Sequence, residues 1–334
     1  MPICCIRALG LAATLLFATS AAYPSAPEIA AAPEFVDPLP ASRGFDPVVP
    51  FEPRARVELG RVWWTAPRAE SVKQVAERFG IAHDDLRALD PSLADGRVAA
   101  GQRVLVYRHD PAAPSRSVGA PNRGRLEHAV PFPEGDGWAL RAYRPRTWAT
   151  RHVVVELAAS ITEWRERFPE AQPVLLGEFS RRGGGTVRPH RSHRSGRDVD
   201  VGYVLLVPPA AHKFTVGTPR TMDAAATWGL VQRLLASGAV ESIFMAESVQ
   251  NQLLPHALAS VAPERLPSVF SVLATDPRAK KQAILRAWGG HDDHMHVRFA
   301  CTDDDVGCRD AERRKKGKKK KGRSAAKRRG AKGR

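Results

Sequence analysis

The chain is poor in cysteine and, apart from one segment near its N-terminus, lacks long apolar runs. It holds four cysteines in 334 residues, and Cys4 and Cys5 precede the apolar segment 8–18. That segment is shorter than the roughly 20 residues a membrane helix needs. It follows Arg7 and precedes small residues suited to cleavage, which is the pattern of a secretory signal. We therefore expect a signal peptide at residues 1–22, export across the inner membrane, and no transmembrane helix.

After removal of such a signal, Cys301 and Cys308 are the remaining cysteines. Two nearby cysteines in an exported protein usually form a disulfide bond. The alternative is a pair of zinc thiolates. Aspartates occupy positions 303 to 305 between them, and there is no second cysteine pair. These observations favour the disulfide.

Several familiar motifs are also missing. The chain has no H-E-x-x-H motif, which excludes the zincin helix, and no G-x-S-x-G nucleophile elbow. It shows no internal repeats and no regular strand-helix-strand repetition. A fold of the α+β class, built around an antiparallel sheet, is the expectation that remains.

The C-terminal segment has many basic and few acidic residues, and it accounts for most of the net charge of +16. Residues 309–334 contain fifteen Lys or Arg and two Asp or Glu, a net +13, so the rest of the chain carries +3. A block of like charges repels itself and buries nothing apolar, so we expect a disordered tail. The tail could hold an anionic wall polymer or lipid, or it could be a solvated tail without a specific partner. Export argues against a specific nucleic-acid partner.

Composition divides the remainder into segments. An Ala/Pro-rich linker is expected at residues 23–57 and a compact unit at 58–108. A second linker (109–123) then leads to a large domain at 124–308. In the compact unit, "RVWWT" and "QRVLVYR" read as strands around helices in "SVKQVAERFG" and "AHDDLRALDPSL".

The pieces "SVKQVAERFGIAHDDLRALDPSL" and "VAAGQRVLVY" resemble the LysM peptidoglycan-binding module. This resemblance implies a βααβ fold and binding of glycan that contains N-acetylglucosamine. The turn "WWTAPRAES" departs from the usual pattern of that module. A small docking domain without a ligand is the alternative interpretation.

The large domain shows clear periodic segments. Helices are expected at residues 148–169, 222–239 and 247–260, and strands at 173–179, 198–207, 240–246 and 294–299. Strand alternation puts Asp198 and Asp200 on one face, and it aims His294 and His296 to one side with Met295 facing inward.

Two short segments, "HRSHRSGRDVD" and "GGHDDHMHVRF", hold five of the eleven histidines. His193, Asp200 and His296 would give zinc two nitrogen ligands and one carboxylate, with a fourth position left open for water. Zinc lowers the pKa of bound water to about 7, which makes hydroxide available at neutral pH. His294 could then accept the water's proton, and His291 could stabilise the oxyanion or protonate the leaving amine.

These two segments allow other interpretations. Ser192 and Ser195 lie near histidines, but adjacency in sequence is not the geometry of a catalytic triad. Histidines that are only surface or core groups would not be expected to gather beside aspartates in two clusters. Three arginines, at positions 191, 194 and 197, are expected to point away from the metal, although they could instead bind substrate carboxylates.

The two segments together carry a specific resemblance. "SHRSGRDVD" with "HDDHMHVRFAC" resembles the penicillin-insensitive murein endopeptidases, part of a zinc peptidase group that includes the D-Ala-D-Ala peptidases and hedgehog domains. The group's pattern of a His, an Asp seven residues later and a distant His-x-His corresponds to His193, Asp200 and His296. The resemblance also implies His190 as a further zinc ligand and catalytic roles for His291 and His294.

The resemblance implies a periplasmic zinc endopeptidase that hydrolyses peptide cross-links of peptidoglycan, at the D-alanyl-meso-diaminopimelyl amide. Two alternatives stay open. One is a zinc D-Ala-D-Ala carboxypeptidase, and the other is a non-catalytic LysM wall-binding protein.

Overall fold

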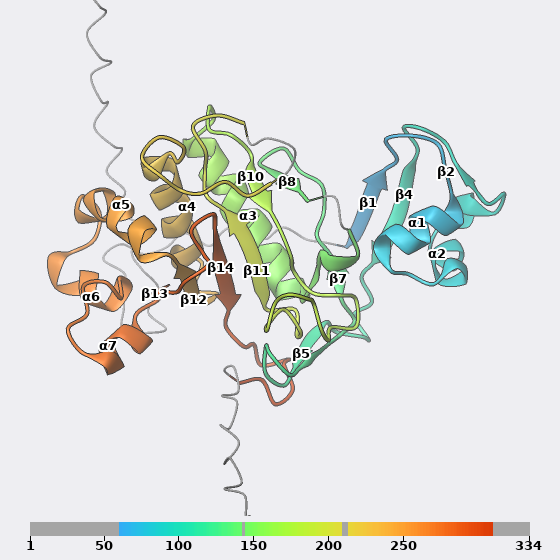
Figure 1. The fold of residues 1–334 in the computed structure, drawn as a ribbon. Coiled ribbons are helices and arrows are strands. Elements are labelled where there is room, and N and C mark those ends of the chain that lie inside the picture. The colour runs from blue at the N-terminus through green and yellow to red at the C-terminus, as the bar shows by residue number, and fades with distance from the viewer. Residues whose placement is uncertain (1–59, 142–143, 209–212, 310–334) are drawn as a thin grey trace, which may run out of the picture. The chain divides into compact units, whose positions relative to one another are not determined.

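A computed structural model describes residues 60–141, 144–208 and 213–309 (Figure 1). The predicted signal peptide and the 23–57 linker lie outside the described residues, as does the basic tail beyond Arg309. Within the described ranges, no helix is both long enough and apolar enough to cross a membrane.

Helices and short strands follow one another irregularly along the chain. The helices are α1 (Val72–Phe79), α2 (His83–Leu89), α3 (Arg151–Arg167), α4 (Ala224–Ala236), α5 (Glu247–Leu258), α6 (Leu266–Val269) and α7 (Pro277–Gln282). The strands are β1 (Arg61–Thr65), β2 (Glu70–Ser71), β3 (Arg97–Val98), β4 (Arg103–Arg108), β5 (Arg116–Val118), β6 (Arg125–Glu127), β7 (Val130–Pro131), β8 (Trp138–Leu140), β9 (Trp148–Ala149), β10 (Val174–Leu176), β11 (Asp198–Gly202), β12 (Val240–Met245), β13 (Leu285–Ala287) and β14 (His294–Phe299). This mixture confirms the predicted α+β class.

The segment 61–108 has the predicted order of strand, two helices and strand, with β1 antiparallel to β4. Ser71 caps α1 through a capping box with Gln74, because each residue's side chain accepts a hydrogen bond from the other's backbone N–H. Gly80 ends the helix in the left-handed conformation at φ 64°, which glycine adopts without steric cost. The capping residue and the glycine therefore set the two ends of α1 from the local sequence.

The large domain is built on a six-stranded sheet in the order β13-β12-β14-β11-β10-β8. The four central strands are antiparallel neighbours, but β13 pairs with β12, and β8 with β10, in parallel. The prediction of an antiparallel sheet was therefore wrong at both edges. Each edge strand is joined to its parallel neighbour through helices, as parallel pairing requires, since a tight hairpin cannot make that connection.

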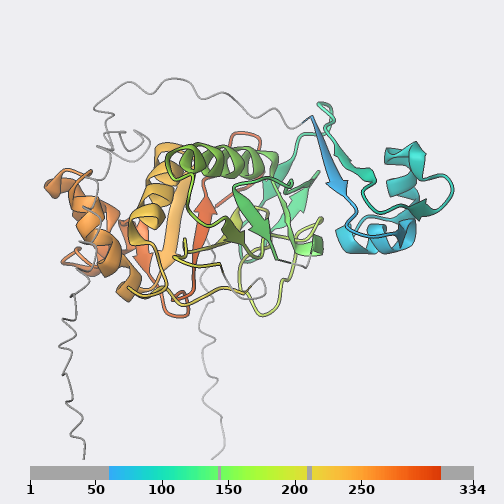
Figure 2. The same cartoon turned by 90° about the horizontal axis from the view of Figure 1, so that it is seen from above.

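The two faces of this sheet differ in chemistry. Val199 and Val201 of β11, and Met295 and Val297 of β14, belong to the hydrophobic core. In Figure 2, α3 and α4 lie along one side of the sheet, and the loops around β11 lie along the other. Strand alternation then turns the aspartates and histidines of β11 and β14 away from the core, as the sequence predicted.

The segment 301–308, near the C-terminal end of the described residues, is hydrogen-bonded to the start of the large domain. Cys301 and Cys308 form a disulfide bond with a Cα–Cα distance of 5.9 Å, which confirms the predicted pair. Between them, Val306 donates its N–H to the carbonyl of Ser117 and accepts a hydrogen bond from the N–H of Gly119. Part of the segment expected to be a linker, residues 109–123, thus contains β5 and contacts the domain.

Arg197 is a buried cation that holds three elements together. Its guanidinium lies 3.1 Å from Oε2 of Glu241 and donates to the carbonyls of Phe299 and Arg309. Replacement by methionine removes a cation that pairs with the buried Glu241 carboxylate. Breaking a buried pair in this way costs roughly 3 to 5 kcal/mol, so we expect the Arg197→Met variant to lose that much unfolding free energy in urea titrations.

The control is Arg191→Met, at an exposed position on the same loop, for which a change within about 0.5 kcal/mol is expected. The double variant Arg197→Met/Glu241→Met removes both charges and should recover most of the loss. A single variant as stable as the wild type would contradict a structural role for this pair.

Candidate functional site

Two neighbouring central strands supply the core of the site. In the antiparallel register of β11 and β14, Asp200 lies opposite His296 and Asp198 opposite Arg298. His193 comes from the loop before β11, with an unusual positive φ of 59° for a residue other than glycine. The fold thereby brings residues more than ninety positions apart in sequence to one point.

Asp200 is the centre of the cluster. Its Oδ1 lies 3.1 Å from Nε2 of His193 and 3.1 Å from Nδ1 of His296. Oδ1 is also 3.8 Å from Nε2 of His294, and Oδ2 is 3.6 Å from Nδ1 of His190. The four histidines therefore aim ring nitrogens at a single carboxylate.

The arrangement fits a metal ion on its own geometry. One donor atom from each of His190, His193 and Asp200 lies within 4.8 Å of the others. His193 is fully buried. Its Nε2 is close to Oδ1 of Asp200, but neither of its ring nitrogens, nor Oδ2 of Asp200, makes a hydrogen bond of good geometry among the described residues. Buried polar atoms without partners are costly unless a ligand satisfies them, and nitrogen with carboxylate oxygen is a donor set that zinc accepts. His296 lies outside that trio, although its Nδ1 faces the same carboxylate.

Access differs across the cluster. The side chains of His193 and Asp200 are 0% and 1% exposed, whereas those of His190 and His294 are 24% and 14% exposed. The buried members are closed off from solvent, and the partly exposed members lie on the side that water or a substrate can reach.

His294 and His291 are oriented through their Nδ1 atoms. Nδ1 of His294 lies 2.5 Å from Oδ1 of Asp293, and Nδ1 of His291 lies 3.1 Å from the carbonyl oxygen of Gly289. An Nδ1–H that donates to these oxygens leaves Nε2 of each ring as an acceptor. This is the arrangement that a proton-transfer residue requires.

Electrostatics in the cluster follows from burial and close pairing. Burial raises the pKa of Asp198 and Asp200, but neighbouring cations and histidines outweigh it and hold both pKa values well below the usual range. For His296, burial opposes the charged form, yet the same two aspartates raise its pKa to about 9. Burial lowers the pKa of His190 and His291, which favours the neutral imidazole that binds a metal or accepts a proton.

Arg191, Ser195 and Arg197, in the same segment 190–200, do not join this cluster. Arg197 points into its ion pair with Glu241, and Arg191 is exposed. Ser195 is buried, and its hydroxyl has no hydrogen-bond partner among the described residues, so it forms no pair with a histidine. The serine-type interpretation has no support in this geometry.

Sequence reasoning missed Phe214, which contacts the site from a loop. Its ring stacks on His294 at 4.8 Å between centroids and 15° between planes, with the Arg141 guanidinium 5.0 Å from its centroid. Nothing in the local pattern around Phe214 indicates this contact. Asp293, by contrast, is adjacent to His294 in sequence and could have been identified as its partner.

Gly177 leaves room for this packing. A Cβ at this position would lie 2.5 Å from Cζ of Phe214 and 3.2 Å from Cβ of Asp200. We expect Gly177→Ala to displace one of these groups and to lower kcat by about 10- to 100-fold, because small misplacements of reacting groups have effects of this size. Steady-state kinetics would measure the change.

Gly183→Ala is the matched control, since a Cβ there meets no atom within 4 Å. Its kinetics should match the wild type. Equal rates for both alanine variants would show that the Phe214 packing does not affect the reaction.

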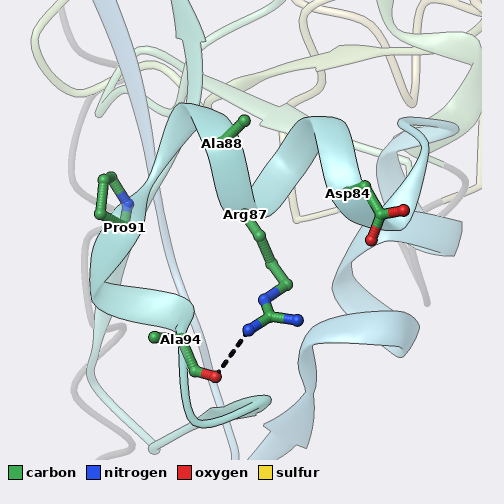
Figure 3. A pocket seen from close by; sticks show the side chains of 5 residues that line it. All are labelled: Asp84, Arg87, Ala88, Pro91 and Ala94. Carbon is green, nitrogen blue, oxygen red and sulfur yellow. Dashed lines mark hydrogen bonds between the residues drawn. The ribbon is translucent and has the colours of Figure 1, made fainter.

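A surface hollow of about 410 Å³ lies in the N-terminal unit, apart from the histidine cluster. It is lined by Asp84, Arg87, Ala88, Pro91 and Ala94 (Figure 3). Arg87 donates to the carbonyl of Ala94 at 2.8 Å across this hollow. Its lining contains no aromatic ring on which a sugar could stack.

An α+β domain in which histidines and aspartates converge on one face of a sheet defines a protein with a potential metal site. Comparison with models of protein families matches residues 117–327 to the penicillin-insensitive murein endopeptidases. The chain belongs to this family and is a peptidase of the murein cell wall. The comparison with curated proteins gave no match.

Proposed function

We propose that this protein is a zinc-dependent endopeptidase that hydrolyses the D-alanyl-meso-diaminopimelyl cross-link of peptidoglycan outside the cytoplasm. The main support for the proposal is that histidine nitrogens converge on the Asp200 carboxylate. In addition, the ring nitrogens of His193 and Oδ2 of Asp200 are buried and make no hydrogen bond among the described residues. Family membership supports the murein substrate.

The proposed zinc ligands are His193, Asp200 and His296, with His190 as a further ligand. When bound there, zinc would polarise the scissile carbonyl and acidify a water molecule. Zinc requires neutral imidazole nitrogens and a carboxylate, so its binding would displace the proton that the two aspartates favour on His296.

We assign proton transfer to the two remaining histidines of the cluster, His294 and His291. His294, oriented by Asp293, accepts the proton of the attacking water through Nε2. Burial lowers the pKa of His291, which favours its neutral form at rest. His291 takes up a proton from solvent and delivers it to the leaving amine as the C–N bond breaks, while the proton accepted by His294 returns to solvent. The products are one stem peptide with a new carboxylate and one with a new amine.

Bond specificity can be tested with a purified cross-linked muropeptide dimer and the full-length protein. Mass spectrometry should show the dimer converted into two monomers, with one water added for each bond cleaved. Release of terminal alanine from intact dimers would instead establish a carboxypeptidase. A dimer left unchanged, with protein that still pellets with cell wall, would replace the enzyme with a binding protein.

The N-terminal unit at residues 58–108 is proposed to be a LysM-like tether to glycan. Its strand and helix order supports this role, and tethering would raise the local concentration of cross-links at the site. Trp63→Ala, which removes an exposed aromatic ring of this unit, should leave cleavage of soluble dimers at the wild-type rate and slow that of intact wall.

A further inference from the structure

Asp198 is a buried carboxylate that the proposed zinc ligand set does not use. It lies on β11 two residues before Asp200 and is 1% exposed. Arg298, opposite it on β14, donates Nε to Oδ1 at 2.8 Å and Nη2 to Oδ2 at 3.3 Å. This two-point pair fixes the carboxylate plane and balances its charge.

The same carboxylate contacts two of the proposed ligands. Its Oδ1 lies 3.3 Å from Nε2 of His296, the ring nitrogen opposite the one that faces Asp200. Its Oδ2 accepts a hydrogen bond of 3.1 Å from the backbone N–H of His193. Asp198 therefore contacts the imidazole ring of one proposed ligand, His296, and the backbone of another, His193.

The contact with His296 has a chemical consequence. A carboxylate faces each ring nitrogen of His296, so both nitrogens can carry a proton while no metal is bound. Where a metal replaces the Nδ1 proton beside Asp200, the carboxylate of Asp198 holds the remaining proton at Nε2. Carboxylates that receive the second N–H of a metal-binding histidine fix both its tautomer and its ring orientation.

The contact with His193 acts on a strained backbone. The positive φ of this residue costs free energy unless neighbouring groups hold it. Asp198 accepts a hydrogen bond from the backbone N–H of His193. The hydroxyl of Ser180 donates to the backbone carbonyl of His193 at 2.8 Å and accepts a hydrogen bond from the N–H of Gly196. The loop that presents His193 is thus fixed on both sides of the residue.

We infer that Asp198 is a positioning residue, which sets the Nε2–H tautomer of His296 and the loop conformation of His193 so that both nitrogens meet at one metal. This inference rests on the proposed zinc site. It assigns Asp198 and Arg298 a function in metal affinity, through residues that they contact, without contact to the reacting atoms.

The test measures zinc affinity of the full-length protein by competition with a chromogenic chelator. Asp198→Asn keeps the shape of the side chain and removes its charge, and the expected result is zinc binding weakened by about 10- to 100-fold. Asp304→Asn, at an exposed position, is the matched control and should bind zinc as the wild type does. An Asp198→Asn variant that folds and binds zinc with wild-type affinity would overturn the inference.

A second measurement does not depend on the folding of any variant. Nitrogen-15 NMR of the histidine rings in zinc-loaded wild-type protein should show His296 protonated at Nε2 and coordinated through Nδ1. The opposite assignment would overturn the inference while leaving the zinc enzyme intact. Wild-type protein that binds no zinc would overturn the proposed function and this inference together.

Discussion

Asp200→Ala, His193→Ala and His296→Ala should each lose at least roughly a thousandfold in kcat/KM for muropeptide dimers, since metal polarisation is worth several kcal/mol and each 1.36 kcal/mol is tenfold. Each substitution removes one proposed zinc ligand. The ring nitrogens of His193 and His296 both face the Asp200 carboxylate, so the loss of any of the three leaves the metal site incomplete. Zinc content, measured by plasma mass spectrometry on the same samples, should fall with the activity.

The control for this set is His256→Ala, a partly exposed histidine on α5. It removes an imidazole outside the cluster and should retain both zinc and activity. Circular dichroism and thermal melting would show that each ligand variant still folds. A folded variant at position 193, 200 or 296 with full activity would refute the ligand set.

His294→Ala and His291→Ala should behave differently from the ligand variants. We expect kcat to fall by about 10²- to 10⁴-fold, the range typical of general acid–base residues, while zinc stays bound. The reason is that Nδ1 of each ring is engaged by an oxygen of Asp293 or Gly289, which leaves Nε2 for proton transfer. KM should change little, because neither ring is proposed to bind the substrate's ground state.

The two sets of variants are distinguished by metal content. If His294→Ala also lost its zinc, this residue would be a ligand and the assignment of roles would be wrong. If His291→Ala kept its full kcat, a group other than His291 would have to protonate the leaving amine.

Much of the site could be predicted because it depends on periodicity. Alternation along β11 and β14 determines which residues share a face, so Asp200 and His296 could be assigned to the polar side of their strands from the sequence alone. Both strands carry valine or methionine at the core positions, which defines the buried face of each. The disulfide followed from the expected compartment and the short spacing of the two cysteines.

The rest depends on contacts that no local pattern encodes. The edge strands β8 and β13 have three residues each, too few to show a period, and their parallel pairing is set by the connections through helices. Phe214 reaches His294 from a loop, and the space it occupies exists because Gly177 lacks a side chain. Asp198 shares a face with Asp200, but its pairing with Arg298 and His193 becomes visible only in three dimensions.

The proposed zinc centre is tested most directly by a zinc titration of chelator-stripped, full-length protein, with the initial rate of dimer cleavage as the readout. We predict negligible activity without metal, and a rate that rises linearly and then levels off at one zinc per chain. Full activity in the stripped protein, or a rate that does not respond to added zinc, would contradict the claim that the His193, Asp200 and His296 cluster is a catalytic zinc centre.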